Sequence, residues 1–263
     1  MAMPIKNDRA AWLKGGNASC SFIPEPQTHP RRFILLGAPG VGKGTQAALL
    51  ANYFNACHLS TGDIFRAAKN CADSEPGPAM CSALEHMDRG ELVSDETVLA
   101  LVAERFKCLR CRGGFLLDGF PRTLAQAQAL EILLAGQNIQ LEAVLDYTLP
   151  LKKIIARLSG RRTCSNCKAV YHIESLPPKV QGICNACGGT LYQRDDDRPE
   201  SIRVRMAAYT KNAAPLKRFY RRRNLLVSIA AAGKPDATFA RTLEALNVNK
   251  PAKNEPQLIT HHA

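Results

Sequence analysis

The sequence predicts an α/β fold in which helices flank a parallel β-sheet. Short apolar runs alternate with longer stretches of helix-forming residues, which is the order typical of such a sheet. These runs are residues 33–36, 115–117, 144–149 and 225–230. The first run leads into a glycine-rich loop, and the second ends at a carboxylate, Asp118. Because ligands of parallel sheets collect at the carboxyl ends of the strands, both features predict a binding site at that edge.

The glycine-rich loop is GAPGVGKGT, residues 37–45, and a helix is expected over residues 43–53. Glycines let successive backbone N–H groups converge on phosphate oxygens at a helix N-terminus, and Lys43 adds a mobile positive charge. The general phosphate-binding loop (P-loop) has a serine or threonine after the lysine as a magnesium ligand. Here Gly44 follows, and the hydroxyl comes one position later at Thr45. The context still predicts a nucleoside triphosphate site rather than a chance glycine-rich turn.

Asp118 is a candidate magnesium ligand. The apolar residues 115–117 predict a buried strand that delivers this carboxylate to its carboxyl end. There it would act on Mg²⁺ directly or through ordered water. A turn-forming aspartate before Gly119 is the alternative. The runs at 144–149 and 225–230 predict two further parallel strands of the same sheet.

Composition predicts a globular protein with one main domain. The 263 residues are 46% hydrophobic and 22% charged, and the net charge of +12 indicates anionic partners, phosphates or nucleic acid. No apolar run reaches the roughly 18 residues that span a bilayer, and residues 1–30 lack the apolar core of a signal peptide. We therefore expect a cytoplasmic protein. Residues 1–31 are expected to form a disordered extension rather than a transit peptide, and residues 247–263 a disordered tail.

Two cysteine pairs predict a structural zinc site. Cys164-x2-Cys167 and Cys184-x2-Cys187 are separated by sixteen residues, and each pair presents two thiolates to half of a tetrahedron. Disulfides are the weaker alternative in a reducing compartment. Four thiolates leave no coordination position for substrate, so we expect zinc to order this segment without entering the chemistry.

Several motifs follow one another in a fixed order from about residue 32 to residue 246. They are GAPGVGKGT, STGDIFR (60–66), GELVSDE (90–96), FLLDGFPRT (115–123) with Gln126, GRR (160–162) and QRDDDRPES (193–201). In these motifs the sequence resembles the adenylate kinases, of the long zinc-binding lid type, within the nucleoside monophosphate kinases. In that family a glycine follows the P-loop lysine, as Gly44 does here.

The resemblance implies the reversible conversion of ATP and AMP to two ADP, which maintains adenine nucleotide balance. It implies a P-loop kinase domain over residues 32–246, with a helical monophosphate-binding (NMP-binding) insertion at 60–92. The zinc ribbon at 160–197 would be a mobile lid that closes over both nucleotides and excludes water. Mg²⁺ with ATP and structural Zn²⁺ are the expected cofactors. ATP and AMP are the expected partners of a monomer without an obligatory protein partner.

The resemblance also implies the residues of the site. ATP would be bound by Gly40, Val41, Gly42, Lys43, Gly44, Thr45, Arg157 and Arg161. AMP would be bound by Thr61, Arg66, Glu91, Val93, Gly119, Arg122, Gln126, Arg194 and Arg205. Catalysis would depend on Lys43, Arg122, Arg161, Arg194 and Arg205, because guanidinium groups grip phosphate oxygens in two places and stay charged. Asp118 would hold magnesium through water.

Two alternatives stay open. The first keeps the kinase activity and changes the acceptor base. Thr61 in STGD favours AMP, and Gln126 would read the edge of the base. The structural alternatives are a helix N-cap for Thr61 and an exposed helical side chain for Gln126. The second is a zinc-ribbon nucleic-acid-binding protein with a regulatory P-loop. That hypothesis would use the basic and aromatic stretch KRFYRRR, residues 217–223, but a solvated, arginine-rich helix face explains this stretch better. Nucleic acid is therefore the disfavoured partner.

Some features fall outside this pattern. A third pair, Cys108-x2-Cys111, has no partner pair and predicts local structure or incidental redox chemistry rather than a metal site. His172 lies near the lid cysteines, and a packed or exposed role is expected for it. The acidic residues 195–197 are expected to orient lid arginines or bind nucleotide hydroxyls. The segment 70–78, NCADSEPGP, is longer and richer in proline than the family's helix at that place.

Overall fold

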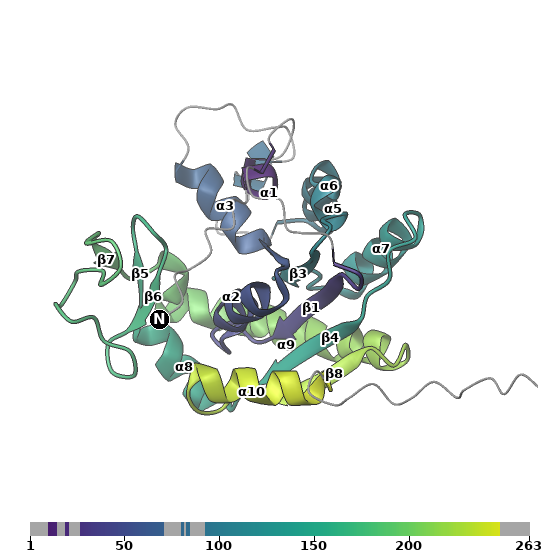
Figure 1. The fold of residues 1–263 in the computed structure, drawn as a ribbon. Coiled ribbons are helices and arrows are strands. Elements are labelled where there is room, and N and C mark those ends of the chain that lie inside the picture. The colour runs from purple at the N-terminus through teal and green to yellow at the C-terminus, as the bar shows by residue number, and fades with distance from the viewer. Residues whose placement is uncertain are drawn as a thin grey trace, which may run out of the picture.

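The computed structural model of this chain describes residues 10–14, 19–20, 27–70, 80–81, 83–84 and 93–247. Its centre is a five-stranded sheet in the order β2-β3-β1-β4-β8, in which every neighbouring pair is parallel (Figure 1). The strands are β1 (Arg31–Gly37), β2 (Cys57–Ser60), β3 (Gly114–Asp118), β4 (Ala143–Thr148) and β8 (Leu226–Ala230). The predicted α/β fold and four of its strands are confirmed. Strand β2 was not predicted, because CHLS is short and half polar.

Helices cover both faces of the sheet. They are α2 (Lys43–Phe54), α7 (Leu124–Ala135), α8 (Leu151–Ser159), α9 (Pro199–Arg221) and α10 (Pro235–Ala245). Successive side chains of a strand point to opposite faces, and β1 follows this rule. Phe33 and Leu35 pack with α2 and α10, whereas Ile34 and Leu36 pack with α7 and α9. Each of these four side chains is at most 6% exposed, so each contributes about 1.5 to 3 kcal/mol.

The parallel register brings three strand ends to one edge. Leu35 of β1 and Ser60 of β2 both lie opposite Asp118 of β3, and Gly37 lies opposite Tyr147 of β4. The glycine-rich loop and the Asp118 carboxylate therefore emerge side by side from the sheet. This edge is where the sequence predicts the binding site.

A small second sheet lies between α8 and α9, on the left of Figure 1, where the lid was predicted, and it is called the lid below. Its strands are β5 (Arg161–Cys164), β6 (Val170–His172) and β7 (Leu191–Tyr192), in the antiparallel order β6-β5-β7. A 3₁₀ turn, η1 (Asp195–Asp197), leads from it into α9. Cys164, Tyr171 and Cys184 form its own small buried cluster.

On the predicted monophosphate-binding side, α3 (Thr61–Asn70) continues directly from β2, and α5 (Asp95–Glu104) and α6 (Phe106–Leu109) lead to β3. Parts of the predicted insertion at 60–92 lie outside the described residues. These parts include Glu91, a predicted AMP contact, and nearly all of the proline-rich segment at 70–78.

The N-terminal region differs from its prediction. The expectation of disorder throughout residues 1–31 is wrong for residues 10–14, which form helix α1 (Ala10–Lys14), and for Arg31, which opens β1. Trp12 is 0% exposed, and its indole Nε1 donates to the backbone oxygen of Ser60 at 2.9 Å. The buried Arg105 donates in turn to the Trp12 oxygen at 2.6 Å. Burial of so large an aromatic side chain offsets the entropy lost when the short helix is ordered. Composition alone did not predict this helix.

Candidate active site

The phosphate-binding loop is held by close backbone packing. Gly37 has φ 135°, and a Cβ at this position would lie 2.5 Å from the Tyr147 oxygen. Gly40 has φ 78°, and a Cβ there would lie 2.5 Å from the Leu158 side chain. Both positions therefore need glycine. Val41 is buried, whereas Gly44 and Thr45 are exposed at the start of α2, where backbone N–H groups can meet an anion.

Lys43 lies across this loop. Its Nζ donates to the Gly37 oxygen at 2.7 Å and to the Ala38 oxygen at 3.0 Å. Burial lowers the pKa of Lys43 to about 8, and the positive charges of Arg122, Arg205 and Arg161 add to that effect while Asp118 opposes it. The ammonium group is thus held among cations from three other segments of the chain.

Asp118 lies at the end of β3, beside the loop. Burial opposes its ionisation, but the nearby His58 and the positive charge of Lys43 outweigh burial and hold the pKa of Asp118 below the usual range. His58 Nε2 lies 3.5 Å from the carboxylate and has no closer partner among the described residues. Sequence reasoning missed His58, because its strand β2 was not predicted. Asp118 is a charged oxygen donor, so it fits the chemistry of a magnesium ligand.

The arginines of the lid side are oriented by an acidic turn. Asp197, 1% exposed, accepts from Arg161 at 2.7 Å (Nε) and 2.5 Å (Nη2), a two-pronged contact. Arg205 of α9 lies 3.7 Å from the same carboxylate and donates to the Asp196 oxygen at 2.7 Å. This confirms that Asp196 and Asp197 orient arginines. Asp195 instead pairs with Arg198 on the surface.

Arg194 completes this group. Its Nε donates to Thr163 Oγ1 of β5 at 2.9 Å. Burial lowers the pKa of Arg194 to about 10, and the positive charges of Arg161 and Arg66 contribute. Arg66 belongs to α3, on the opposite side of the edge from the lid. Cations from the P-loop, the lid and the monophosphate-binding side therefore act on one another across a shared space.

On the monophosphate-binding side, Thr61 and Gly119 approach closely. Thr61 is 3% exposed, and its Oγ1 has no hydrogen-bond partner among the described residues. A Cβ at Gly119 would lie 2.9 Å from that Oγ1. The helix cap of α3 is Ser60, whose Oγ accepts from the Asp63 N–H at 3.3 Å, so the alternative of Thr61 as an N-cap is wrong.

Two predicted AMP-site arginines make local contacts. Arg66 Nη2 contacts Asp63 Oδ1 at 2.5 Å, which keeps the guanidinium along the first turns of α3. Arg122 Nε donates to the Gly119 oxygen at 2.6 Å, and the Arg122 side chain is exposed. Val93 is half-buried beside the core.

Gln126 is buried, so the alternative that it is an exposed helical side chain is wrong. It is 3% exposed, its Oε1 accepts from the Arg122 N–H at 2.7 Å, and its Nε2 donates to Asp95 Oδ1 at 2.7 Å. Thr123 Oγ1 donates to the other Asp95 oxygen at 2.7 Å. The second Nε2 hydrogen has no hydrogen-bond partner among the described residues. Sequence reasoning missed Asp95, which lies 31 residues away from Gln126 along the chain.

Arg157 of α8 braces the P-loop from the side. Its Nη1 donates to the Val41 oxygen at 3.0 Å, and its Nη2 donates to Ala231 and Gly233 oxygens at 3.0 and 3.1 Å. A Cβ at Gly42 would lie 3.7 Å from Arg157. The guanidinium therefore joins the loop to the chain that follows β8, close to where the loop would hold a nucleotide.

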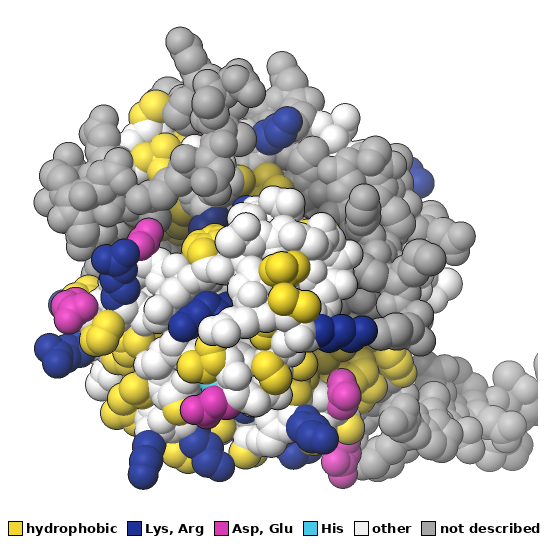
Figure 2. Space-filling view, turned by 90° about the vertical axis from the view of Figure 1, so that its left-hand side faces the viewer, with side chains coloured by type: hydrophobic (Ala, Val, Ile, Leu, Met, Phe, Trp, Pro, Cys, Tyr) yellow, Lys and Arg dark blue, Asp and Glu magenta, His cyan; other side chains and the backbone are white. Residues whose placement is uncertain are grey.

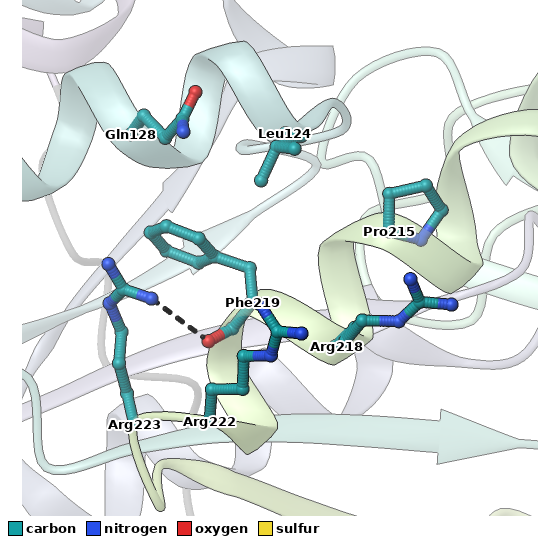
Figure 3. A pocket seen from close by; sticks show the side chains of 7 residues that line it. All are labelled: Leu124, Gln128, Pro215, Arg218, Phe219, Arg222 and Arg223. Atoms are coloured by element: carbon teal, nitrogen blue, oxygen red, sulfur yellow. Dashed lines mark hydrogen bonds between the residues drawn. The ribbon is translucent and has the colours of Figure 1, made fainter.

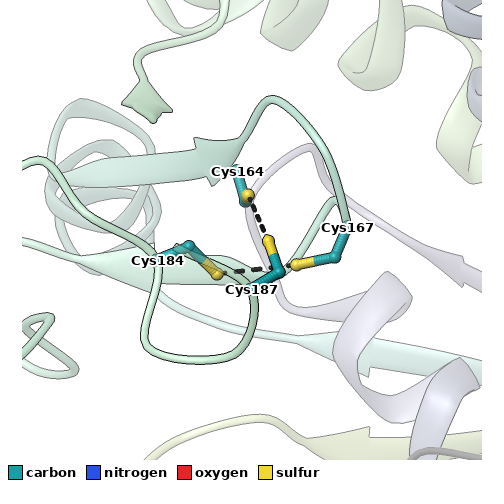
Figure 4. Close-up of side chains that lie close together, drawn as sticks. All are labelled: Cys164, Cys167, Cys184 and Cys187. Atoms are coloured by element: carbon teal, nitrogen blue, oxygen red, sulfur yellow. Dashed lines mark hydrogen bonds between the residues drawn. The ribbon is translucent and has the colours of Figure 1, made fainter. Parts of the chain in front are cut away.

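The four lid cysteines form one cluster (Figure 4). The Sγ atoms of Cys164, Cys167, Cys184 and Cys187 all lie within 4.8 Å of one another. Tetrahedral zinc with bonds of about 2.3 Å places its sulfur ligands roughly 3.8 Å apart, so the thiols fit this ion. The Tyr171 hydroxyl lies 3.3 Å from Cys184 Sγ and, as the main cause, lowers the Cys184 pKa to about 6, which favours the ligating thiolate.

His172 takes no part in the cysteine cluster. Its Nδ1 accepts from the backbone N–H groups of Glu174 and Ser175 at 3.1 Å. Its Nε2 lies 3.2 Å from the Ala156 oxygen and therefore carries the donated proton. The expectation of a packed or exposed histidine fits this partly buried ring, which fastens the lid to α8.

The basic stretch 217–223 borders a separate pocket of about 340 Å³ between α7 and α9 (Figure 3). Phe219 and Tyr220 are buried, so their rings are not offered to nucleic-acid bases. Arg223 pairs with Glu131, and its guanidinium lies 3.5 Å from the centre of the Phe219 ring. Figure 2 views the molecule from a different side, the one that carries the small second sheet, and basic side chains are scattered there among hydrophobic and acidic ones. The burial of Phe219 and Tyr220 and the pairing of Arg223 match the solvated helix face rather than the nucleic-acid patch.

A P-loop at the carboxyl edge of a parallel sheet, faced by arginines of a separate lid, defines the P-loop class of nucleotide-binding proteins. Among the described residues no helix has both the length and the apolar character needed to cross a bilayer. The family description "Adenylate kinase" matches residues 35–225. The chain belongs to the adenylate kinase family, as the sequence motifs predicted, and is a phosphotransferase.

Named relatives agree with this assignment. The adenylate kinase of Carboxydothermus hydrogenoformans is 46% identical over 82% of this chain and 99% of its own length. That of Streptomyces griseus is 43% identical over 83% and 98%, and that of Acidothermus cellulolyticus is 46% identical over 82% and 97%. The similarity therefore extends over nearly the whole of each relative.

Proposed function

We propose that this protein transfers the γ-phosphoryl group of ATP to AMP, forming two ADP, and catalyses the reverse reaction. Membership of the adenylate kinase family supports this reaction. The observation that carries it is the gathering of Lys43 with Arg122, Arg161 and Arg205: burial lowers the pKa of Lys43 to about 8, and the positive charges of these arginines add to that effect. Such a concentration of like charge is costly in an empty site and favourable around two polyphosphates.

The proposed chemistry needs positioning and positive charge. The P-loop N–H groups and Lys43 would hold the donor phosphates, with Arg157 bracing the loop. Arg122, Arg161, Arg194 and Arg205 would stabilise charge on the equatorial oxygens of the transferring group. A strong general base is unnecessary, because the accepting phosphate oxygen is already an anion.

Mg²⁺ would accompany ATP. Asp118 is the residue that would hold it through water, since the carboxylate is ionised, lies beside the P-loop and is 3.5 Å from a Cβ placed on Gly44. The ion would neutralise phosphate charge when bound. His58 and the positive charge of Lys43 favour the ionised form of Asp118.

Residues 160–197 would serve as a lid ordered by Zn²⁺ on Cys164, Cys167, Cys184 and Cys187. The fit of the thiols to a tetrahedron supports this role. Zinc would keep β5 and β7 in place, so that Arg161 and Arg194 reach the phosphates when the lid closes and water is excluded.

AMP is the proposed acceptor, bound by Thr61, Arg66, Gly119, Arg122 and Gln126, together with Glu91 of the insertion at 60–92 and Val93 just after it. The buried, unpartnered Thr61 Oγ1 supports a ligand at this place. The hydrogen bonds of Gln126 limit how it can recognise the base. Because its Oε1 already accepts from the Arg122 N–H, Gln126 would offer one N–H to an acceptor atom of the base. A different acceptor base stays the second candidate.

The test is ADP formation by purified protein supplied with ATP, Mg²⁺ and each nucleoside monophosphate separately. We expect rapid turnover with AMP and loss of turnover in Lys43→Ala, with the exposed Lys153→Ala as control. Arg161→Ala should lower kcat on the order of 10³-fold, as for arginines that stabilise transferring phosphate. Arg162, the neighbouring residue on β5, donates only to the local Ser159 and Arg161 backbone oxygens in the described part of the chain, so Arg162→Ala should leave kcat nearly unchanged.

Other outcomes point to the other candidates. Turnover with UMP, CMP or GMP in place of AMP would overturn the acceptor assignment and retain the phosphoryl-transfer mechanism. Retained ATP binding without transfer to any monophosphate would contradict the kinase and favour nucleic-acid binding, measurable by gel shift. Cytoplasmic location and a monomeric state stay predictions, to be checked by fractionation and light scattering.

A further inference from the structure

A second thiol site lies at the opposite end of β2 from Thr61. Cys57 opens β2, and Cys111 follows α6, 54 residues later, yet their Sγ atoms are 2.7 Å apart. Both side chains are half-buried, so neither is sealed in the core. This pairing differs from the sequence interpretation, which considered Cys111 with Cys108.

The turn before β3 explains why Cys111 meets Cys57. The Gly114 N–H donates to the Cys111 oxygen at 2.9 Å, which folds the chain back just before β3. Gly114 has φ 87°, and a Cβ there would lie 1.9 Å from the Arg31 oxygen, so glycine holds this turn against β1. In the sheet Cys57 lies opposite Phe115, the residue after Gly114. The start of β2 and the turn are therefore held together by the backbone.

The other nearby thiols are less suited to react. Cys108 is 8% exposed in the main core, and burial raises its pKa to about 11. Cys20 is half-buried against the same core. A hydrogen bond from Cys57, the largest cause, lowers the Cys111 pKa to about 7 despite burial, and the same bond raises the Cys57 pKa. Either thiol can donate in this contact, and the lowered pKa makes Cys111 the more readily ionised thiol of the pair, with Cys57 as its partner.

We propose that Cys57 and Cys111 form a reversible disulfide by exchange with a low-molecular-weight disulfide such as oxidised glutathione. The Cys111 thiolate attacks one glutathione sulfur and releases a glutathione thiolate, which takes the Cys57 proton. Cys57 then attacks Cys111 Sγ and releases the second glutathione thiolate, which takes a proton from water. Two protein thiols are oxidised, and one glutathione disulfide is reduced to two thiols.

The bond would tie the edge strand β2 to the turn before β3, far along β2 from Ser60 and Thr61. Cross-linking residues this distant in sequence stabilises mainly by restricting the unfolded chain. The oxidised protein should therefore unfold at a higher temperature than the reduced protein, by on the order of 5 to 15 °C. This site is independent of the proposed kinase activity.

The test equilibrates the full-length, zinc-loaded protein in glutathione buffers of increasing oxidised fraction, followed by acid quenching, alkylation and peptide mass spectrometry. We expect a peptide linked through Cys57 and Cys111 in the wild type and in the control Cys108→Ala. Cys57→Ala should instead carry glutathione on Cys111. The thermal midpoint should rise on oxidation in wild type and Cys108→Ala, and stay unchanged in Cys57→Ala and Cys111→Ala.

Linkage of Cys111 to Cys108 or Cys20 would overturn the proposal. So would free, alkylated Cys57 and Cys111 in fully oxidising buffer. Circular dichroism of each variant establishes that it is folded before oxidation, and the wild-type linkage map stands even if one variant does not fold.

Discussion

The substitution Asp197→Asn tests whether the acidic turn before α9 orients the lid arginines. Asp197 is 1% exposed and accepts two Arg161 hydrogen bonds, of 2.7 and 2.5 Å. Asparagine keeps one acceptor and presents an amide N–H₂ to the second Arg161 donor, and it removes the charge that also faces Arg205 at 3.7 Å. Loss of one charge-assisted hydrogen bond and of the buried pairing should cost about 2 to 4 kcal/mol.

Urea denaturation followed by circular dichroism measures this cost, and the thermal midpoint should fall by roughly 5 to 15 °C. Misplaced arginines should also lower kcat by roughly 10- to 100-fold on the folded enzyme. Asp195→Asn is the matched control, because Asp195 is 93% exposed and pairs with Arg198 one turn away. It should change stability by less than about 0.5 kcal/mol. Equal stability of the two variants, or destabilisation by Asp197→Asn with unchanged kcat, would refute the reasoning.

Three further outcomes are expected. Burial lowers the pKa of Lys43 to about 8, so the lysine loses its charge above that pH. The affinity of the free enzyme for ATP should therefore fall by up to about tenfold per pH unit above pH 8. Calorimetry from pH 7 to 9.5 measures this fall, and Lys43→Arg should make the affinity nearly independent of pH. Chelation of zinc, or the substitution Cys167→Ser, should unfold the lid and lower the thermal midpoint. Atomic emission should find roughly one zinc ion per intact chain. An unchanged midpoint after complete metal removal would argue against a structural zinc. Trp12→Ala should cost about 3 to 5 kcal/mol in urea denaturation, whereas Ile132→Ala, 74% exposed, should cost almost nothing; equal costs would show that α1 contributes no stability.

Local sequence was sufficient for the parts of this protein whose chemistry is local. The P-loop was predictable because Gly37 and Gly40 adopt backbone conformations that favour glycine, and both lie within a few residues of Lys43. The strands β1, β3, β4 and β8 were predictable because their buried runs are apolar. The cysteine pairs at 164–167 and 184–187 were predictable because each pair sits within a single turn.

Other parts depended on residues far apart in sequence. Strand β2 escaped prediction because its short, half-polar run becomes a strand through pairing with β3. Helix α1 is ordered because Trp12 reaches Ser60 and Arg105. Neither the hydrophobic pattern of the N-terminal residues nor their composition carries information about those partners.

The sequence by itself determined the fold class, the family and the residue types that meet phosphate and metal, because spacing within short motifs dictates which backbone and side-chain groups can converge. The tertiary structure alone decided their partners. It brought Asp197 to Arg161 and Arg205, Asp95 to Gln126, and Cys57 to Cys111, since each pairing follows from how separate helices and strands pack around one sheet.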